Sequence, residues 1–244
     1  MRNVIVTGGS RGIGLGIVRT LANAGYRAIA VARSRSSALD DAIEEPRRNA
    51  CGEVRFASFD LDRLDAAADF IRSLRKEHGP IYGLVNNAGI SVEGMLSTMA
   101  TVDIERLVRI NTTAPMVLTK YAVRQMMAAG EGRIVNISSI VASTGYSGLS
   151  VYAATKASMI GFTRSLAREV GPLGVTVNAV APGFVDTDLT AHMPAQNRAA
   201  VARRAALRRL PQIEDVARAV LYLIGEDARN VTGTVLTIDA GGTA

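Results

Sequence analysis

Short runs rich in β-branched residues alternate with longer segments of helical periodicity from one end of this chain to the other. In the longer segments, apolar residues recur at positions i, i+3, i+4 and i+7, as on one face of a helix. Such alternation predicts repeated β-α units, with helices on both faces of a parallel sheet. The expected fold class is therefore α/β, with a doubly wound, seven-stranded parallel sheet. The expected strands are Val4–Thr7, Ala28–Ala32, Val54–Phe59, Gly83–Asn86, Arg133–Ser138, Val175–Val180 and Thr234–Ile238, and the expected helices include Ile13–Ala24, Leu64–Leu74, Ile104–Met127, Tyr152–Val170 and Ile213–Ile224.

We expect one domain over residues 1–244, because no linker, repeat or low-complexity tract interrupts this alternation. The segment at about 183–211 differs from the rest, since it lacks a strand pattern and is rich in Arg and Ala. This composition favours a helical insertion after the sixth strand. Loops at the carboxyl ends of parallel strands bind ligands in such folds, so the segment is the expected substrate lid.

Composition excludes several classes of protein. The one cysteine, Cys51, cannot form a disulfide within the chain, and two histidines are too few for a Cys/His zinc site, so no metal is expected. The 28 basic residues are scattered and aromatic residues make up 5%, which argues against nucleic-acid binding. No window reaches the roughly 18 apolar residues of a membrane span, and the first apolar run is too short for a signal peptide. We expect a cytoplasmic protein that does not bind membranes.

A glycine-rich turn directly follows the first expected strand and precedes a helix. Its glycines permit a sharp turn, the close approach of a pyrophosphate and tight packing of the helix on the strand. The N–H groups at the start of the helix would face the phosphates. An ordinary β-α loop is the alternative, but the position after the first strand favours a dinucleotide site. The expected contacts here are Gly8, Ser10, Arg11, Gly12, Ile13 and Gly14.

Further motifs follow along the chain. Together with the turn they are Thr7-Gly8-x-x-x-Gly12-x-Gly14, Asn86-Asn87-Ala88-Gly89, Asn111, Ser139, Tyr152-x-x-x-Lys156 and Pro182-Gly183. In this order and spacing the chain resembles, over essentially its whole length, the short-chain dehydrogenase/reductase family, and most of all its 3-oxoacyl carrier-protein reductase branch. The resemblance implies a Rossmann fold, a nicotinamide cofactor and hydride transfer between that cofactor and a ketone or secondary alcohol. It also implies a homotetramer.

Charge at the end of the second strand predicts which nicotinamide cofactor is bound. An NAD-binding site would place an acidic residue there, but this strand ends in Arg33, Ser34 and Arg35. Arg11 adds a basic group, and a guanidinium matches a phosphate through paired hydrogen bonds. We therefore expect NADP(H), the alternative being that these arginines are simply solvated. The resemblance implies further cofactor contacts at Asp60, Leu61, Asn87, Ala88, Gly89, Tyr152, Lys156, Pro182, Gly183, Val185 and Thr187.

Tyr152 and Lys156 are four residues apart on an expected helix and so share one face. Reduction of a ketone requires a proton donor whose pKa is near the working pH, and the ammonium of Lys156 is expected to lower the pKa of Tyr152. By resemblance, the hydroxyl of Ser139 orients the substrate carbonyl. Ser138 is the alternative for that role.

The expected helix Ile104–Met127 contains Asn111 and, four residues later, Pro115. A proline lacks the N–H that would bond the carbonyl four residues earlier, so a helix irregularity is expected at Asn111. By resemblance, Asn111 is a catalytic residue whose backbone carbonyl supports a proton relay from Lys156.

The expected substrate is a small molecule with a carbonyl or alcohol group. The resemblance implies a 3-oxoacyl thioester, but the two stretches at which that branch carries arginines for its carrier protein, here Ala128–Glu131 and Gly171–Leu173, contain none. This departure argues against carrier-protein recognition. A free acyl-CoA, small cyclic ketone, sugar or polyol is an alternative substrate, and a non-catalytic NADP(H) sensor is an alternative function. The expected substrate contacts are Ser139, Tyr146, Tyr152 and Phe184.

Overall fold

The structure is a computed structural model that describes residues 1–45, 52–185 and 195–244. Within these residues, seven strands form one sheet in which all neighbouring strands are parallel. They are β1 (Asn3–Thr7), β2 (Arg27–Ala32), β3 (Glu53–Ser58), β4 (Ile81–Asn86), β5 (Gly132–Ile137), β6 (Val175–Pro182) and β7 (Val235–Ile238). Their order is β3-β2-β1-β4-β5-β6-β7, so the winding reverses between β1 and β4. The predicted fold class is confirmed, and each expected strand lies within two residues of the observed one.

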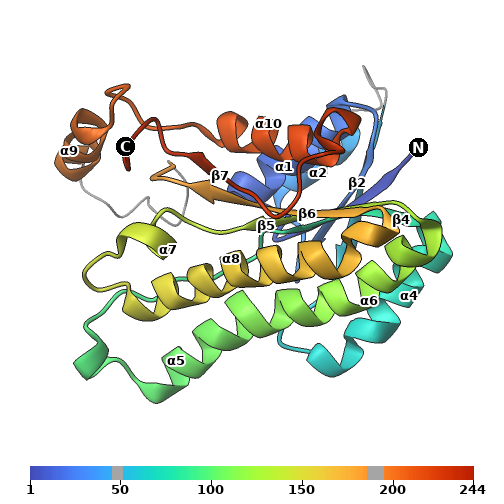
Figure 1. Ribbon diagram of the computed structural model, residues 1–244, viewed down its shortest axis with the longest axis horizontal. Helices are drawn as coiled ribbons and strands as arrows, with labels where there is room; N and C mark the ends of the chain where they lie inside the picture. The colour runs from blue at the N-terminus through green and yellow to red at the C-terminus, as the bar shows by residue number, and fades with distance from the viewer. Residues whose placement is uncertain (46–51, 186–194) are drawn as a thin grey trace.

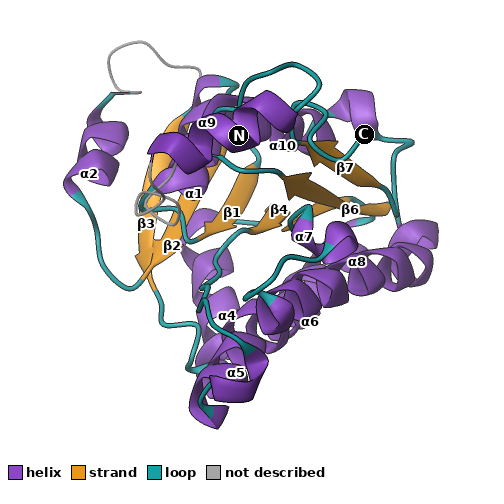
Figure 2. Ribbon diagram, turned by 90° about the vertical axis from the view of Figure 1, so that its left-hand side faces the viewer, coloured by secondary structure: helices purple, strands orange, loops and turns teal. Residues whose placement is uncertain are grey.

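Helices cover both faces of the sheet (Figures 1 and 2). One face carries α1 (Gly12–Asn23), α2 (Ser37–Glu44) and α10 (Ile213–Ile224), and the other carries α4 (Ala67–His78), α5 (Thr101–Val108), α6 (Ala114–Ala129) and α8 (Ser150–Val170). The shorter helices α7 (Val141–Thr144) and α9 (Ala195–Arg204) follow β5 and β6. Single helical turns occur at Leu64–Ala66, Leu96–Thr98, Gly171–Leu173 and Glu226–Ala228.

Side chains that alternate along the strands build two apolar cores. In β1, Val4 and Val6 pack with side chains of α1 and α10, whereas Ile5 faces the side of α4, α6 and α8. The same alternation places Ile29 of β2 in the second core. Because both faces of the sheet are buried, its strands are nearly continuous apolar runs, which is why they were recognisable in the sequence.

The expected helix Ile104–Met127 is interrupted. A π-helical turn over Arg109–Thr113 separates the end of α5 from the start of α6. Pro115 lies in the first turn of α6, directly after the π-helical turn, and it has no N–H to donate to the carbonyl of Asn111. The irregularity expected at Asn111 is therefore confirmed, and its form is a π-helical turn between two helices, a feature often found at functional sites.

Three short helices, α2, α7 and α9, bear on the remaining expectations. The apolar pattern did not predict α2 or α7, which are only eight and four residues long. The expected lid contains α9, which is helical as predicted. Residues 186–194, including Thr187, and also Cys51 lie outside the described residues. None of the helices in the described ranges is long and apolar enough to cross a membrane.

Candidate active site

Four loops meet at one edge of the sheet. They follow β1, β4, β5 and β6 and comprise residues 8–11, 87–90, 138–140 and 183–185. Because the strands are parallel, their carboxyl ends share this edge, and folds of this kind bind ligands where the winding reverses, here between β1 and β4. Gly8, Asn87, Ser139 and Gly183, which were singled out in the sequence, therefore lie along this one edge of the sheet.

The glycine-rich turn after β1 has the geometry of a phosphate cradle. Gly8 and Gly12 adopt positive φ angles of 67° and 54°, a region that residues with a side chain rarely occupy. A Cβ atom at Gly14 would lie 2.1 Å from the carbonyl oxygen of Gly8, so only glycine lets α1 approach the turn this closely. Arg11 precedes α1 without a side-chain cap, and the first turn of α1 has no acidic residue. The backbone N–H groups of this first turn therefore have no side-chain acceptor within the helix start, as an anion-binding site requires.

The loop after β4 supports this turn from the side. The side-chain amide of Asn87 donates to the carbonyl of Thr7 at 2.9 Å, and the backbone N–H groups of Asn87 and Ala88 donate to the Thr7 hydroxyl at 3.0 and 3.1 Å. At the next residue, Gly89, a Cβ atom would come within 3.3 Å of the Lys156 ammonium. Asn87, Ala88 and Gly89 thus join the glycine-rich turn to the region of Lys156.

The arginines near the second strand have different surroundings. Arg35 forms an ion pair with Asp40 at 3.5 Å and stacks over the ring of Phe56. Arg11 and Arg33 are exposed, and among the described residues neither forms an ion pair or a side-chain hydrogen bond. Two guanidinium groups are therefore available for an anionic ligand beside the glycine-rich turn. Ser34, next to Arg33, is also exposed, whereas Asp60 and Leu61 are partly buried after β3.

Lys156 lies in the second turn of α8 and is buried, with 5% of its surface exposed. Its ammonium donates to the carbonyl of Ile137 at 2.9 Å and lies 5.7 Å from the centre of the Tyr152 ring. Burial lowers the pKa of Lys156 to about 8, because the charged form loses its hydration. This lysine is therefore held as a buried cation below that pH, one turn from Tyr152.

The structure separates the two candidate serines. The hydroxyl of Ser138 is buried and donates to the carbonyl of Lys156 at 2.9 Å, so it is engaged in holding α8. The hydroxyl of Ser139 accepts from the N–H of Val141 at 3.4 Å, and it is close enough to the phenol of Tyr152 to act against the rise in that pKa. Ser139, the residue chosen from the sequence, is the serine that meets the phenol.

Burial raises the pKa of Tyr152, and the hydroxyl of Ser139 offsets only part of that increase. The expectation that Lys156 lowers the pKa of Tyr152 is wrong for this structure. The reason is geometric: the ammonium of Lys156 points to the carbonyl of Ile137, and loss of hydration dominates at the phenol.

Asn111 joins the loop after β4 to α8. Its side-chain oxygen accepts from the N–H of Ile90 and its amide donates to the Ile90 carbonyl, both at 2.8 Å. The same amide donates to the hydroxyl of Thr155 at 3.1 Å, and Thr155 donates to the backbone carbonyl of Tyr152 at 2.7 Å. Sequence reasoning missed Thr155, because only the fold shows that this hydroxyl links Asn111 to the helix that carries Tyr152.

The expected substrate residues Tyr146 and Phe184 come from different loops and meet edge to face, with ring centres 6.1 Å apart. Tyr146 is 54% exposed, so an aromatic surface is open to solvent at this edge.

Three of the predicted cofactor residues lie at or just after the end of β6. Pro182 ends β6, Gly183 donates to the carbonyl of Ile238 at 2.9 Å, and Val185 is buried. No group of His, Cys, Asp and Glu side chains in the described part of the chain could hold a metal ion.

Comparison with known proteins defines the class. The profile of short chain dehydrogenases matches residues 2–198, most of the chain. The protein is thus an oxidoreductase that uses a nicotinamide cofactor and acts on CH–OH or ketone groups. It belongs to the short-chain dehydrogenase family.

Similar proteins cover nearly the full length. The 3-oxoacyl-[acyl-carrier-protein] reductase FabG of Chlamydia pneumoniae is 37% identical over 240 residues, covering 98% of this chain and 96% of the relative. FabG of Escherichia coli (strain K12) is 37% identical over 239 residues, covering 97% and 95%. A crystal structure of a candidate gluconate dehydrogenase from Agrobacterium tumefaciens is similar with a TM-score of 0.93 and 25% identity, covering 100% of this chain and 96% of the other.

Proposed function

We propose that this protein is an NADP(H)-dependent reductase of a 3-oxoacyl thioester, acting reversibly on the ketone and the corresponding secondary alcohol. The observation that carries the proposal is the cluster of Ser139, Tyr152 and Lys156 beside a glycine-rich turn flanked by Arg11 and Arg33. The FabG reductases of C. pneumoniae and E. coli support the choice of substrate class.

The glycine-rich turn and the exposed arginines beside it support the choice of NADP(H). The positive φ angles of the turn, the close packing at Gly14 and the uncapped start of α1 suit a pyrophosphate, and two exposed guanidiniums suit a 2′-phosphate. When bound, the nicotinamide supplies or accepts a hydride. The residues proposed to hold the cofactor are Gly8, Ser10, Arg11, Gly12, Ile13, Gly14, Arg33, Ser34, Asp60, Leu61, Asn87, Ala88, Gly89, Tyr152, Lys156, Pro182, Gly183, Val185 and Thr187.

The chain's own residues provide the proton chemistry. The phenol of Tyr152 donates a proton to the carbonyl oxygen during reduction and takes it back during oxidation. The hydroxyl of Ser139, which interacts with that phenol, orients the carbonyl, and Lys156, buried one turn from Tyr152, would hold the ribose hydroxyls of the nicotinamide nucleotide. Asn111 holds the loop after β4 and the start of α8 in register. Tyr146 and Phe184 form the aromatic wall on the substrate side.

A sugar or polyol is the second candidate substrate. Two observations favour it: the stretches Ala128–Glu131 and Gly171–Leu173 lack arginines, and a candidate gluconate dehydrogenase has a closely similar structure. The predicted lid segment at about 183–211 would then recognise a small polar molecule and not an acyl chain.

NADPH oxidation followed optically separates these candidates. The panel includes an acetoacetyl thioester, simple cyclic ketones and keto-sugars, with NADH as the second cofactor and Tyr152→Phe as the inactive control. We expect fast turnover of the thioester with NADPH. Selective turnover of another carbonyl, with the thioester idle, would reject the acyl substrate. Tight cofactor binding with no turnover of any carbonyl would instead indicate a sensor.

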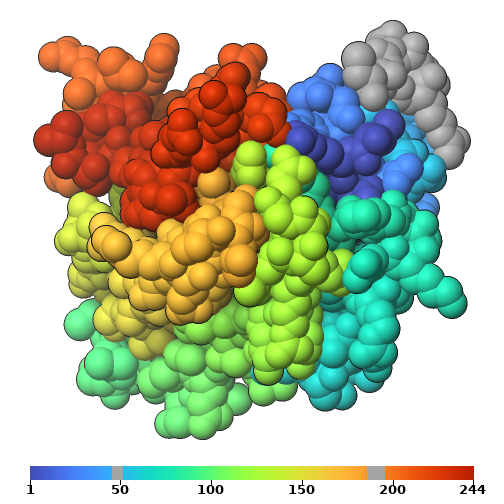
Figure 3. Space-filling model, turned by 45° about the vertical axis from the view of Figure 1, so that its right-hand side comes forward, coloured from blue at the N-terminus to red at the C-terminus, as the bar shows by residue number. Residues whose placement is uncertain are grey.

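The assembly proposed is a homotetramer of this domain. α6 and the carboxyl-terminal part of α8 lie side by side on one face of the molecule (Figure 3), and β7 is the edge strand of the sheet. Two apolar side chains of α5, Val102 and Val108, are 66% and 42% exposed, as expected if a second copy covers them. Light scattering on the protein as it elutes from a size-exclusion column should give a molar mass of about four times the 25.7 kDa of one chain.

A further inference from the structure

Ser36 links two segments that carry the exposed arginines. It precedes α2 as the N-cap residue, and its hydroxyl accepts from the N–H of Leu39 at 3.2 Å. The same hydroxyl donates to the backbone carbonyl of Ser10, in the glycine-rich turn, at 2.5 Å. One partly buried side chain thus connects the start of α2 to the residue before Arg11.

The bond to Ser10 constrains Arg11. The carbonyl of Ser10 and the N–H of Arg11 belong to one planar peptide group, so holding the carbonyl fixes the orientation of the whole group. Arg11 has an extended backbone, with φ −159° and ψ 170°, and directly precedes α1. The direction in which the Arg11 side chain leaves the turn therefore depends on the contact with Ser36.

The second arginine is held on the other side. The hydroxyl of Ser58 donates to the carbonyl of Arg33 at 2.9 Å, and the N–H of Gly8 donates to the carbonyl of Val31 at 2.8 Å. The backbone at the end of β2 is therefore tied to β3 and to the glycine-rich turn. The segment after β2, residues 33–36, is therefore held at both ends. The carbonyl of Arg33 is bonded to Ser58, and the hydroxyl of Ser36 is bonded to the carbonyl of Ser10.

We infer that Ser36 is a positioning residue for recognition of the 2′-phosphate, an inference that rests on the proposed preference for NADP(H). Ser36 sets the spacing between the guanidiniums of Arg11 and Arg33, and two donors aimed at one phosphate require a fixed separation. NADH has a hydroxyl where NADPH has this phosphate. Loss of the Ser36 bridge therefore weakens NADPH binding and leaves NADH binding unchanged.

Equilibrium titration of the free protein with NADPH and with NADH, followed by the fluorescence of the reduced nicotinamide, tests the inference without turnover. The variants are Ser36→Ala and Ser36→Gly, with Ser37→Ala as the matched control, since Ser37 is an exposed serine one position later. Glycine is nearly as good an N-cap as serine, so Ser36→Gly removes the bridge while keeping most of the capping preference. Thermal unfolding of each variant reports folding separately.

We expect the Kd for NADPH to rise about two- to tenfold in both Ser36 variants, the range that loss of one hydrogen bond produces. The Kd for NADH should stay within twofold, and Ser37→Ala should match the wild type for both. An equal loss for the two cofactors, or no change for NADPH, would overturn the role of Ser36. Equal binding of NADPH and NADH by the wild type would reject the cofactor preference itself, and this inference with it, before any variant is considered.

Discussion

Lys156→Met is expected to make the free protein more stable while it abolishes catalysis. The ammonium of Lys156 is buried, and its pKa falls from the ordinary 10.5 to about 8 because burial removes its hydration. A difference of this size corresponds to roughly 3 kcal/mol of unfavourable free energy for the charged form. The hydrogen bond to the Ile137 carbonyl is also lost, at a cost of about 1 kcal/mol. We therefore expect a gain of about 2 kcal/mol in the free energy of unfolding at pH 7.

The sign of the pH dependence follows from the same pKa. Above about pH 10.5 Lys156 is neutral in both the folded and the unfolded protein, so burial carries no charging cost. As the pH falls from 10.5 to 8 the unfolded chain binds the proton first, and the stability of the folded protein decreases. Below pH 8 the full cost is present. The advantage of Lys156→Met should thus be large at pH 7 and nearly absent at pH 10.

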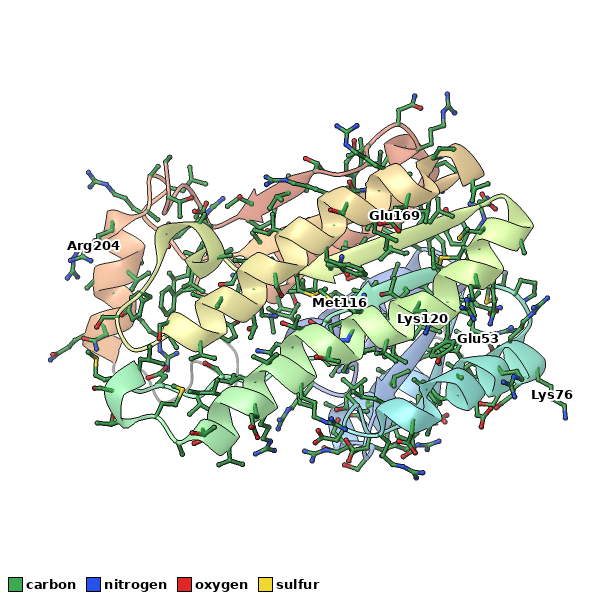
Figure 4. The ribbon with its side chains drawn as sticks, turned by 60° about the horizontal axis from the view of Figure 1, so that its bottom comes forward. Glu53, Lys76, Met116, Lys120, Glu169 and Arg204 are labelled. Carbon is green, nitrogen blue, oxygen red and sulfur yellow. The ribbon has the colours of Figure 1, made fainter. Side chains whose placement is uncertain are left out.

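Urea unfolding at one protein concentration measures the difference in stability between Lys156→Met and the wild type, once at pH 7 and once at pH 10. Lys76→Met is the matched control, because Lys76 is an exposed lysine of α4 that extends from the surface (Figure 4). It should leave the stability nearly unchanged at both pH values. The reasoning is refuted if Lys156→Met is no more stable than the wild type at pH 7, or if its advantage is the same at both pH values.

Three further predictions concern the proposed site. Tyr152→Phe removes the proton donor and should leave less than a tenth of the turnover, while a fluorescence titration should still show NADPH binding. Higher residual activity would reject Tyr152 as the donor. Gly14→Ala places a Cβ atom 2.1 Å from the Gly8 carbonyl oxygen. We therefore expect the free energy of unfolding in urea to fall by about 2 kcal/mol and NADPH binding to weaken. Wild-type values for both would contradict the packing argument. Arg33→Ala should weaken NADPH binding about tenfold without affecting NADH binding. Arg35→Ala should change the binding of neither cofactor, because the Arg35 side chain already contacts Asp40 and Phe56. Similar effects of the two variants would show that an exposed, unpaired arginine is not the one that binds the phosphate.

The positions of many candidate site residues could be predicted, because in this fold the residues that bind ligands follow the carboxyl ends of the strands. Parallel strands end at one edge, so residues that directly follow strands, such as Gly8, Asn87 and Ser139, are brought together whatever the distance between them in the sequence. The four-residue spacing of Tyr152 and Lys156 determines their shared helix face. A proline four residues after Asn111 marked the irregularity that became the π-helical turn.

Other features depended on contacts that no local pattern contains. Ser138 and Ser139 are adjacent and chemically identical, and only their partners on α8 separate them. Arg33 and Arg35 differ because Asp40 and Phe56 engage one and not the other.

The sequence by itself therefore determined the order of helices and strands along the chain, the doubly wound class and the position of the glycine-rich turn, since each depends on local periodicity or on short spacing. The catalytic residues remain predictions from the same kind of spacing. The tertiary structure alone decided which side chains are free and which are engaged, and the direction in which pKa values shift. Burial raises the pKa of Tyr152 and lowers that of Lys156. The fold also brings Thr155 to Asn111 and Ser36 to Ser10, so that each pair forms a hydrogen bond. The physical reason is that hydration and hydrogen-bond partners depend on groups far apart in the chain, which the sheet brings within a few ångströms of one another.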